Sequence, residues 1–327
     1  MTAILNLDFW TYVFVIAGIY AVFAAGLQIQ YGEAGLINLG HVAFMALAAN
    51  TMAILVIKFA VPMVLASLAG IGAAMLFALC LGIPALRLRT DYLSMTTIAA
   101  SQIVRYLSLN LQTVTGGPQG STGLLGPGQL AQYNPEWTAF QNRVQQLLAS
   151  VFGNGVTPDM AMLVIVWSVV AVVISLVWVL SRSPWGRVVR SIREDEEAAE
   201  ALGKNTYRYK LQVLVLGAAL AGVAGLLLAW DLSVFTPYDF LPIVTFYAYI
   251  IVIIGGMTNI RAVPIGAILF GILFAATRFL NIFPLSELQS GQRAYLRLFV
   301  VGLLLLLFMV LRPQGVFGKR EELVLEK

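Results

Sequence analysis

Long apolar runs separated by short polar segments dominate the chain. A helix needs about 20 predominantly apolar residues to cross a bilayer. Nine runs approach or reach that length, at residues 9–27, 36–57, 61–83, 92–111, 161–180, 211–230, 241–254, 263–283 and 295–311. The second and fourth runs are the least hydrophobic. The pattern predicts an all-α, polytopic membrane bundle of about 8–10 helices, with residues 1–327 as a single domain.

Small residues recur every four positions in two of these runs. They are Ala66, Gly70, Ala74, Ala78 and Gly82 in the third run and Gly217, Ala221 and Gly225 in the sixth. Such stripes let helix backbones approach closely in lipid, where little hydrophobic force drives helix association. They predict tight helix packing rather than a chemical role.

Two Gly-rich breaks resemble each other. The segments "YGEAGLINLGHVAF" (residues 31–44) and "IGGMTNIRAVPIGAILF" (residues 254–270) each place glycines at the end of one apolar run and then start a helix. Transporters are often built from repeats that contain broken helices. The similarity of these two segments suggests an internal repeat that contains broken helices.

The charges are few and unevenly distributed. The chain is 60% hydrophobic and 11% charged, with a net charge of +4. Alternate connecting segments, at residues 28–35, 84–90, 181–210 and 255–262 together with the tail from residue 312, hold 14 of the 20 Lys and Arg. The positive-inside rule places these segments in the cytoplasm. We therefore expect residues 112–160 outside, the N-terminus outside and the C-terminus inside. The first run lacks a cleavage signal and is expected to be a retained span.

Enzyme signatures are missing from the sequence. "ALGKN" and "VFGKR" contain Gly-Lys but lack the upstream glycine and the following Ser or Thr of a P-loop. His41 has no Cys or carboxylate at metal-ligand spacing, and Cys80 has no partner for a disulfide. The small basic excess fits membrane orientation better than nucleic-acid binding. We expect a non-enzymatic protein without a cofactor, metal or nucleic-acid partner.

Polar residues inside apolar runs are candidates for a substrate path. They are Asn38 and His41 in the second run and Thr96, Thr97, Ser101 and Gln102 in the fourth. Polar groups in membrane helices often face the bundle interior and mark a transport pathway. Hydrogen bonding between helices remains the alternative. The external Gly-rich "TGGPQGSTG" at residues 115–123 is a candidate gate or receptor-contact element, with an ordinary Gly-rich turn as the alternative.

One short stretch, "SIREDEEAAEALGKN" at residues 191–205, concentrates charge. Its Glu- and Ala-rich part favours a short helix, and the acids at its start complement the helix dipole. Gly203 is placed to end that helix in a left-handed conformation. Ala198 and Ala199 have small side chains, so part of the helix surface projects little and the helix would fit a groove on a partner. A solvated loop at the lipid headgroups is the alternative.

A family resemblance bears on this choice. "EAAEALG" at residues 197–203 resembles the E-A-A-x-x-x-G loop of bacterial ABC-transporter permeases. The longer stretch from residue 185 to 227 is similar to M-type permeases of branched-chain amino acid (Liv-type) importers. "TDYLSMTTIAASQIVRYL", "TGGPQGSTGL" and "LRPQGVFG" carry the same resemblance. It implies that residues 181–210 form a cytoplasmic coupling loop. Its ATPase-contacting residues would be Glu194, Glu197, Ala198, Ala199 and Gly203.

The resemblance also implies partners and a location. The implied protein partners are a second, H-type permease, two cytoplasmic ATPase subunits that use ATP, and an external solute-binding protein. The implied location is the bacterial inner membrane, where the chain contacts lipid. Relatives often carry an acid where this chain has Gln102, although glutamine can still bond Arg105. The expected function is import of branched-chain or other neutral amino acids. The alternatives are a urea or short-amide importer, an ion-coupled secondary transporter, and a structural membrane subunit.

Overall fold

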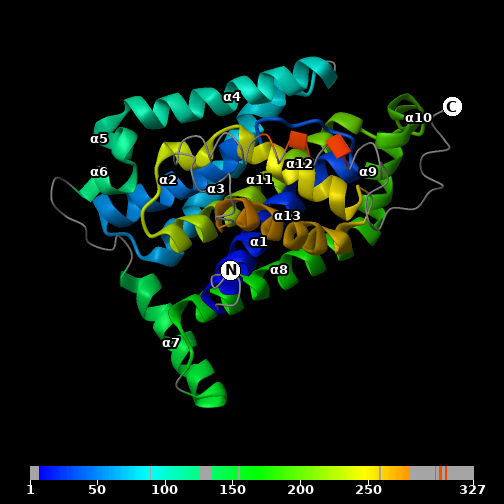
Figure 1. Cartoon of the computed structure of the whole chain (residues 1–327). Coiled ribbons are helices and arrows are strands. Elements are labelled where there is room, and N and C mark those ends of the chain that lie inside the picture. Colours follow the sequence, from blue (N-terminus) through cyan, green and yellow to red (C-terminus); the bar gives the residue numbers. More distant parts are fainter. Residues whose placement is uncertain are drawn as a thin grey trace.

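The computed structural model describes residues 7–88, 90–125, 135–153, 155–257 and 259–279, together with residues 299, 302, 303, 306 and 307. All elements in these ranges are helical (Figure 1). The first half contains α1 (Leu7–Leu27), η2 (Gln28–Glu33), α2 (Val42–Phe59), α3 (Met63–Ala85), α4 (Thr90–Asn110), α5 (Gln112–Thr115), η3 (Gly117–Gln119), α6 (Ser121–Leu125) and α7 (Pro135–Phe152). The second half contains α8 (Pro158–Arg182), α9 (Pro184–Glu194), α10 (Glu196–Ala201), α11 (Thr206–Leu232), η4 (Pro237–Phe240), α12 (Ile243–Gly255), η5 (Ile260–Ala262) and α13 (Val263–Phe279).

Most of the expected membrane spans correspond to long apolar helices. Helices α1 with η2, α2, α3, α8 and α11 are each long and apolar enough to cross a bilayer. Helices α12 and α13 meet the same criterion only as a pair bent by 109°, which is the geometry of a broken span or of a re-entrant loop. The sequence predicted these two as separate spans. The expected ninth span, at residues 295–311, lies largely outside the described residues.

Helix α4 differs from the other predicted spans. It is helical where expected, but it does not reach the hydropathy of the membrane-crossing helices. It lies along one flank of the bundle (Figure 1), where it contacts α2 and α3. Its sequence is amphipathic because threonines, serines and glutamine are interspersed among its apolar residues.

Helix α1 is the centre of the bundle. In its most apolar stretch 89% of the residues are buried, against 22% for α8 on the periphery. Helix α1 packs against α8, α11, α12 and α13, while α2, α3 and α11 form a second packed group. The bundle therefore has two helix groups that share α11.

The small-residue stripes lie at helix contacts, as the sequence predicted. All five small residues of the stripe on α3 and all three on α11 are buried. At Gly70, a Cβ would lie 2.6 Å from the carbonyl oxygen of Ala48, so only glycine lets α2 and α3 approach this closely. Gly72 faces open space on the same helix.

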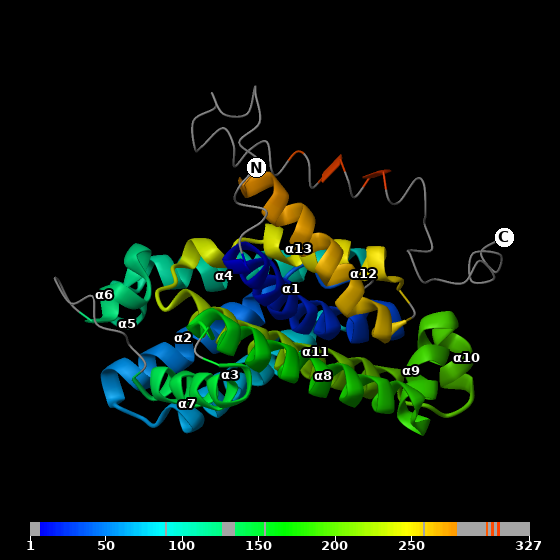
Figure 2. The same cartoon turned by 60° about the horizontal axis from the view of Figure 1, so that its bottom comes forward.

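The bundle has two distinct ends. Figure 2 shows α9 and α10 at one end and α5 and α6 at the other. At the α10 end, the Tyr207 hydroxyl donates to the Ile83 carbonyl at 3.0 Å. At the opposite end, the indole rings of Trp137 and Trp230 stack with their centroids 4.5 Å apart. Long-range contacts therefore hold together the segments at each end.

Two features were not predicted in this form. The polar region at residues 112–160 was expected to be a loop, but it contains the 18-residue helix α7, which packs on α8. The second span was expected to start at residue 36, but α2 begins at Val42. Between α1 and α2, the chain forms η2 and then a non-helical segment, because Gly32 and Gly35 interrupt the helical pattern.

Candidate functional site

Helix α10 is a short helix with a defined cap at each end. The Asp195 carboxylate accepts a hydrogen bond from the Ala198 amide at 2.9 Å and caps the N-terminus. At the C-terminus, Gly203 has φ of +77°, its amide donates to Glu200 O, and the Lys204 amide donates to Ala199 O. These two bonds and the left-handed glycine form a Schellman motif. The predicted role of Gly203 as the left-handed terminator is confirmed.

Two side-chain pairs fix α10 against the start of α11. Lys210 Nζ lies 2.5 Å from Glu196 Oε2, and Thr206 Oγ1 donates to Glu200 Oε1 at 2.6 Å. The Asn205 side chain caps α11 by accepting from the Arg208 amide. Both the start and the end of α10 are therefore bonded to α11.

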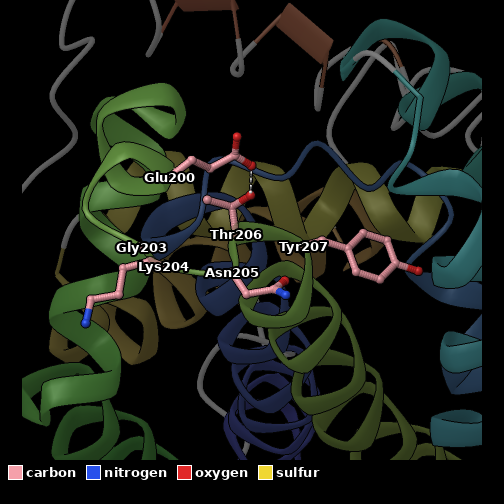
Figure 3. A pocket seen from close by; sticks show the side chains of 6 residues that line it. All are labelled: Glu200, Gly203, Lys204, Asn205, Thr206 and Tyr207. Carbon is pink, nitrogen blue, oxygen red and sulfur yellow. Dashed lines mark hydrogen bonds between the residues drawn. The ribbon is translucent and has the colours of Figure 1, made fainter.

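An open pocket of about 420 Å³ lies where α10 meets α11. Figure 3 shows its lining side chains, with Thr206 bonded to Glu200 and Lys204 pointing away from Tyr207. Its lining residues are Glu200, Gly203, Lys204, Asn205, Thr206 and Tyr207. Backbone, carboxylate, ammonium and amide groups all reach this surface, so it can form hydrogen bonds to a partner protein.

The five predicted contact residues occupy different places in this region. Glu194 is the last residue of α9, and Glu197 lies in the first turn of α10. Both are exposed, as are Ala198 and Gly203. Ala199 is only 2% exposed and faces inward. The thin outer surface therefore comes from Ala198, while Ala199 packs α10 onto its own protein.

Helix α9 links α10 to the bundle through two arginines. Arg193 Nη1 donates to the Gly32 carbonyl at 2.5 Å. Arg190 Nη1 lies 3.6 Å from Glu33 Oε2, and its Nη2 donates to Ser181 O at 3.0 Å. The loop that carries α10 is thus bonded directly to η2.

Four of the six polar residues proposed for a substrate path are buried in the bundle. Asn38, His41, Thr97 and Ser101 are each at most 3% exposed. The Leu39 amide donates to Thr97 Oγ1 at 3.1 Å, so the segment before α2 contacts α4. The structure brings these four residues to the interior of the protein.

The other two residues of that set lie elsewhere. Thr96 and Gln102 are partly exposed, on either side of the buried face of α4 that carries Thr97 and Ser101. Thr96 Oγ1 donates to Tyr92 O within its own helix, and Gln102 Oε1 accepts from Arg105 at 3.3 Å. The expected bond between Gln102 and Arg105 is present, but the six residues do not share one face.

Sequence reasoning missed four buried polar residues beside this set. Gln28 and Gln30 on η2 and Thr245 on α12 are each 0% exposed, and Glu33 is 4% exposed. The predicted topology placed residues 28–35 in a cytoplasmic connection, so their polarity suggested nothing unusual. Gly32 and Gly35 were the available signal, because glycines inside a polar break allow the chain to turn back into the protein.

The described part of the chain contains no group of three His, Cys, Asp or Glu that could hold a metal ion. Its interior polar residues are mostly uncharged amides, hydroxyls and an imidazole. Such groups form hydrogen bonds with a polar solute without holding it as strongly as a charge would.

The chain matches known transport proteins over almost its full length. Residues 9–309 match the family model described as "Branched-chain amino acid transport system / permease component". The high-affinity branched-chain amino acid transport system permease protein LivM of Salmonella typhimurium (strain LT2) is 34% identical over 310 residues, which cover 91% of this chain and 67% of LivM. LivM of Escherichia coli (strain K12) gives the same identity and coverage.

A second type of permease is also similar. LivH of Escherichia coli (strain K12), likewise described as a high-affinity branched-chain amino acid transport system permease protein, is 28% identical over 315 residues. The match covers 92% of each chain. No solved structure matches this chain.

Proposed function

The chain belongs to the family of branched-chain amino acid transport permeases, and we propose that it is one permease subunit of an ATP-driven importer for branched-chain or other neutral amino acids. It is a multi-pass helical membrane protein. In our proposal it transports the solute, while separate ATPase subunits on the cytoplasmic side bind and hydrolyse ATP.

The geometry of α10 is the observation that carries this proposal. A helix of six residues would not be stable alone in water. Here an Asp195 cap, a Schellman motif and bonds to Lys210 and Thr206 hold it in one orientation while Glu197 and Ala198 stay exposed. A preorganised helix with a thin outer surface suits insertion into a groove on another protein, because little conformational entropy is lost on binding.

The proposed mechanism is a shift between two arrangements of the bundle. Closure of the ATPase dimer around ATP moves the groove that holds α10. Since α10 is bonded to α11, and α9 to η2, the movement favours one access state of the permease over the other. A second, H-type permease would complete the pathway, and an external solute-binding protein would deliver the solute.

The described interior fits a zwitterionic solute with no net charge. Its one buried carboxylate among the described residues, Glu33, faces Arg190 at 3.6 Å rather than an open path. An ion-coupled secondary transporter would need an interior carboxylate that is free to bind a proton or cation. The ion pair with Arg190 makes Glu33 less available for that role, and the similarity to LivM and LivH supports the ATP-driven alternative.

The test is uptake by the complete transporter in proteoliposomes. The chain, its H-type permease and the two ATPase subunits are reconstituted with the solute-binding protein outside and ATP inside. We expect radiolabelled L-leucine to accumulate only with ATP and the binding protein. Uptake of labelled urea but not leucine would assign the short-amide alternative, and leucine uptake driven by a sodium or proton gradient without ATP would overturn the proposal.

A further inference from the structure

We propose that the η2 segment is the positioning element that carries movement of the cytoplasmic loop into the membrane bundle, with Arg193 and Gln30 as its two principal contacts. This inference rests on the proposed function, because it assumes that α10 is moved by a partner. It adds the route by which that movement reaches the interior.

The outer side of η2 is held by α9. Arg193 donates to the carbonyl of Gly32, and Arg190 lies against Glu33. Gly35, with φ of +69°, passes so close to Arg193 that a Cβ there would lie 3.2 Å from Arg193 Cγ. The positions of Gly32, Glu33 and Gly35 therefore depend on the position of α9.

The inner side of η2 is bonded to the rest of the bundle. Gln30 Nε2 donates to the Leu214 carbonyl of α11 at 3.1 Å, and Gln30 Oε1 accepts from Asn38 Nδ2 at 2.9 Å. Gln28 Nε2 donates to the Met257 carbonyl, in the break between α12 and α13. The break between α1 and α2, which contains η2, is therefore joined to the break between α12 and α13 through the side chain of Gln28.

The segment that follows η2 extends these contacts. Asn38 Oδ1 accepts from the Gly40 amide, the Leu39 amide donates to Thr97 of α4, and the Val42 amide donates to Thr245 of α12 at 3.1 Å. In this proposal a displacement of η2 reaches α4, α11 and α12 through these hydrogen bonds. Of these helices, α4 carries Thr97 and Ser101, two of the buried polar residues proposed for the solute path.

The local conformation suits a moving part. A π-helix is rare and often marks a functional position. The polar groups of η2 are bonded to α9 and α11, so the position of η2 depends on the positions of these two helices. Within the described part of the chain, the buried Gln28 Oε1 and His41 Nδ1 have no hydrogen-bond partner, so a rearrangement that satisfied them would be favourable. A different arrangement of the same groups would supply the second state that coupling requires.

The experiment measures leucine uptake per ATP hydrolysed in proteoliposomes of the complete transporter. Arg193→Met removes the bond to Gly32, and Gln30→Met removes the bonds to Leu214 and Asn38 at similar side-chain length. We expect each variant to keep the ATPase subunits and at least half of the ATP hydrolysis, with uptake per ATP reduced at least tenfold. Arg193→Lys retains a donor for the Gly32 carbonyl and should recover at least half of the coupling.

Arg187→Met is the matched control. Arg187 is exposed on the same helix, and among the described residues its guanidinium bonds only the nearby Arg182 carbonyl, at 3.4 Å. We expect this variant to couple normally. Normal uptake per ATP in both Arg193→Met and Gln30→Met would overturn the inference, and so would an equal loss in Arg187→Met.

The two proposals fail in different ways. Loss of the ATPase subunits from Arg193→Met would overturn the inference alone, because Arg193 would then belong to the docking surface. If the unmodified chain does not bind ATPase subunits, the proposed function fails, and the inference fails with it. Inserted amounts are measured for every variant, so that the ratio refers to folded transporter.

Discussion

The Thr206 hydroxyl donates a 2.6 Å hydrogen bond to the Glu200 carboxylate, joining the last turn of α10 to the first residue of α11. Thr206 is 3% exposed, whereas Glu200 lies on the surface. The pair thus connects the proposed ATPase-binding helix to a helix that runs through the bundle. The orientation of α10 is set by the membrane domain, and this relationship underlies the predictions for that helix.

Replacing Gly203 with valine should impair coupling while leaving the bundle folded. At φ of +77° a residue with a Cβ costs roughly 1 kcal/mol, and no atom lies within 4 Å of the new Cβ. We expect normal insertion, much weaker co-purification of the ATPase and at least a tenfold loss of leucine uptake.

Gly153→Val is a matched control for this substitution. Gly153 follows α7, has φ of +86°, and no atom lies within 4 Å of the place that a Cβ would take. We expect it to leave uptake and ATPase binding nearly unchanged. Equal losses in the two variants would mean that left-handed glycines matter generally and would remove the argument for α10.

Ala198→Trp should block ATPase binding by steric clash. Ala198 is exposed, so the indole has room in the isolated permease but not inside a groove. Uptake per inserted molecule should collapse, and little ATPase should be recovered by pull-down. Ser191→Trp, on the exposed surface of α9, is the control. Full transport by Ala198→Trp would show that α10 is only a solvated turn.

The chain alone should hydrolyse no ATP. Its sequence lacks a P-loop, and phosphate release from the purified permease should equal that of a buffer blank. Adding the ATPase subunits should produce hydrolysis. Turnover that co-elutes with this polypeptide through successive purification steps and is absent from a mock preparation would contradict the prediction.

The α10 end of the bundle should face the cytoplasm. After Cys80→Ser, single cysteines are introduced at exposed Lys204 and at exposed Asn142 of α7. In intact cells an impermeant thiol reagent should label position 142 and should label position 204 only after the membrane is opened. The reverse pattern would invert the proposed topology.

Gly70→Val should destabilise the packing of α2 on α3. The added Cβ would lie 2.6 Å from Ala48 O, and overpacking of this kind costs about 1–3 kcal/mol. The apparent Tm of the detergent-solubilised permease should fall by several degrees. Gly72→Val, which meets open space two residues away, should change it little. Equal shifts would assign the effect to valine in the helix rather than to the contact.

The sequence was informative where local rules decide the structure. The small residues from Ala66 to Gly82 fall on one helix face by spacing alone, and the left-handed position of Gly203 follows from its place after a Glu- and Ala-rich helix. Both depend on neighbours within a few residues, so no knowledge of the tertiary structure was needed.

Other features depend on residues far apart in the chain. Thr96 and Thr97 are adjacent, yet one is partly exposed and the other is buried, because only the packing of α4 fixes its rotation. Gln30 bonds Leu214, which is 184 positions away, so the burial of η2 could not be read from its own composition. The amphipathic α7 was missed because its polar residues suggested a loop.

The stacked indoles of Trp137 and Trp230 offer an optical reporter of transport. Helix α11 has 27 residues, a length of about 40 Å, and runs from the α10 junction to this pair. If α11 moves as a rigid rod, a tilt of about 5° about its α10 end displaces the Trp230 end by about 3 Å. That displacement is enough to separate two rings whose centroids are 4.5 Å apart. The intrinsic fluorescence of a variant that keeps only these two tryptophans would then change during the ATP cycle without any attached dye.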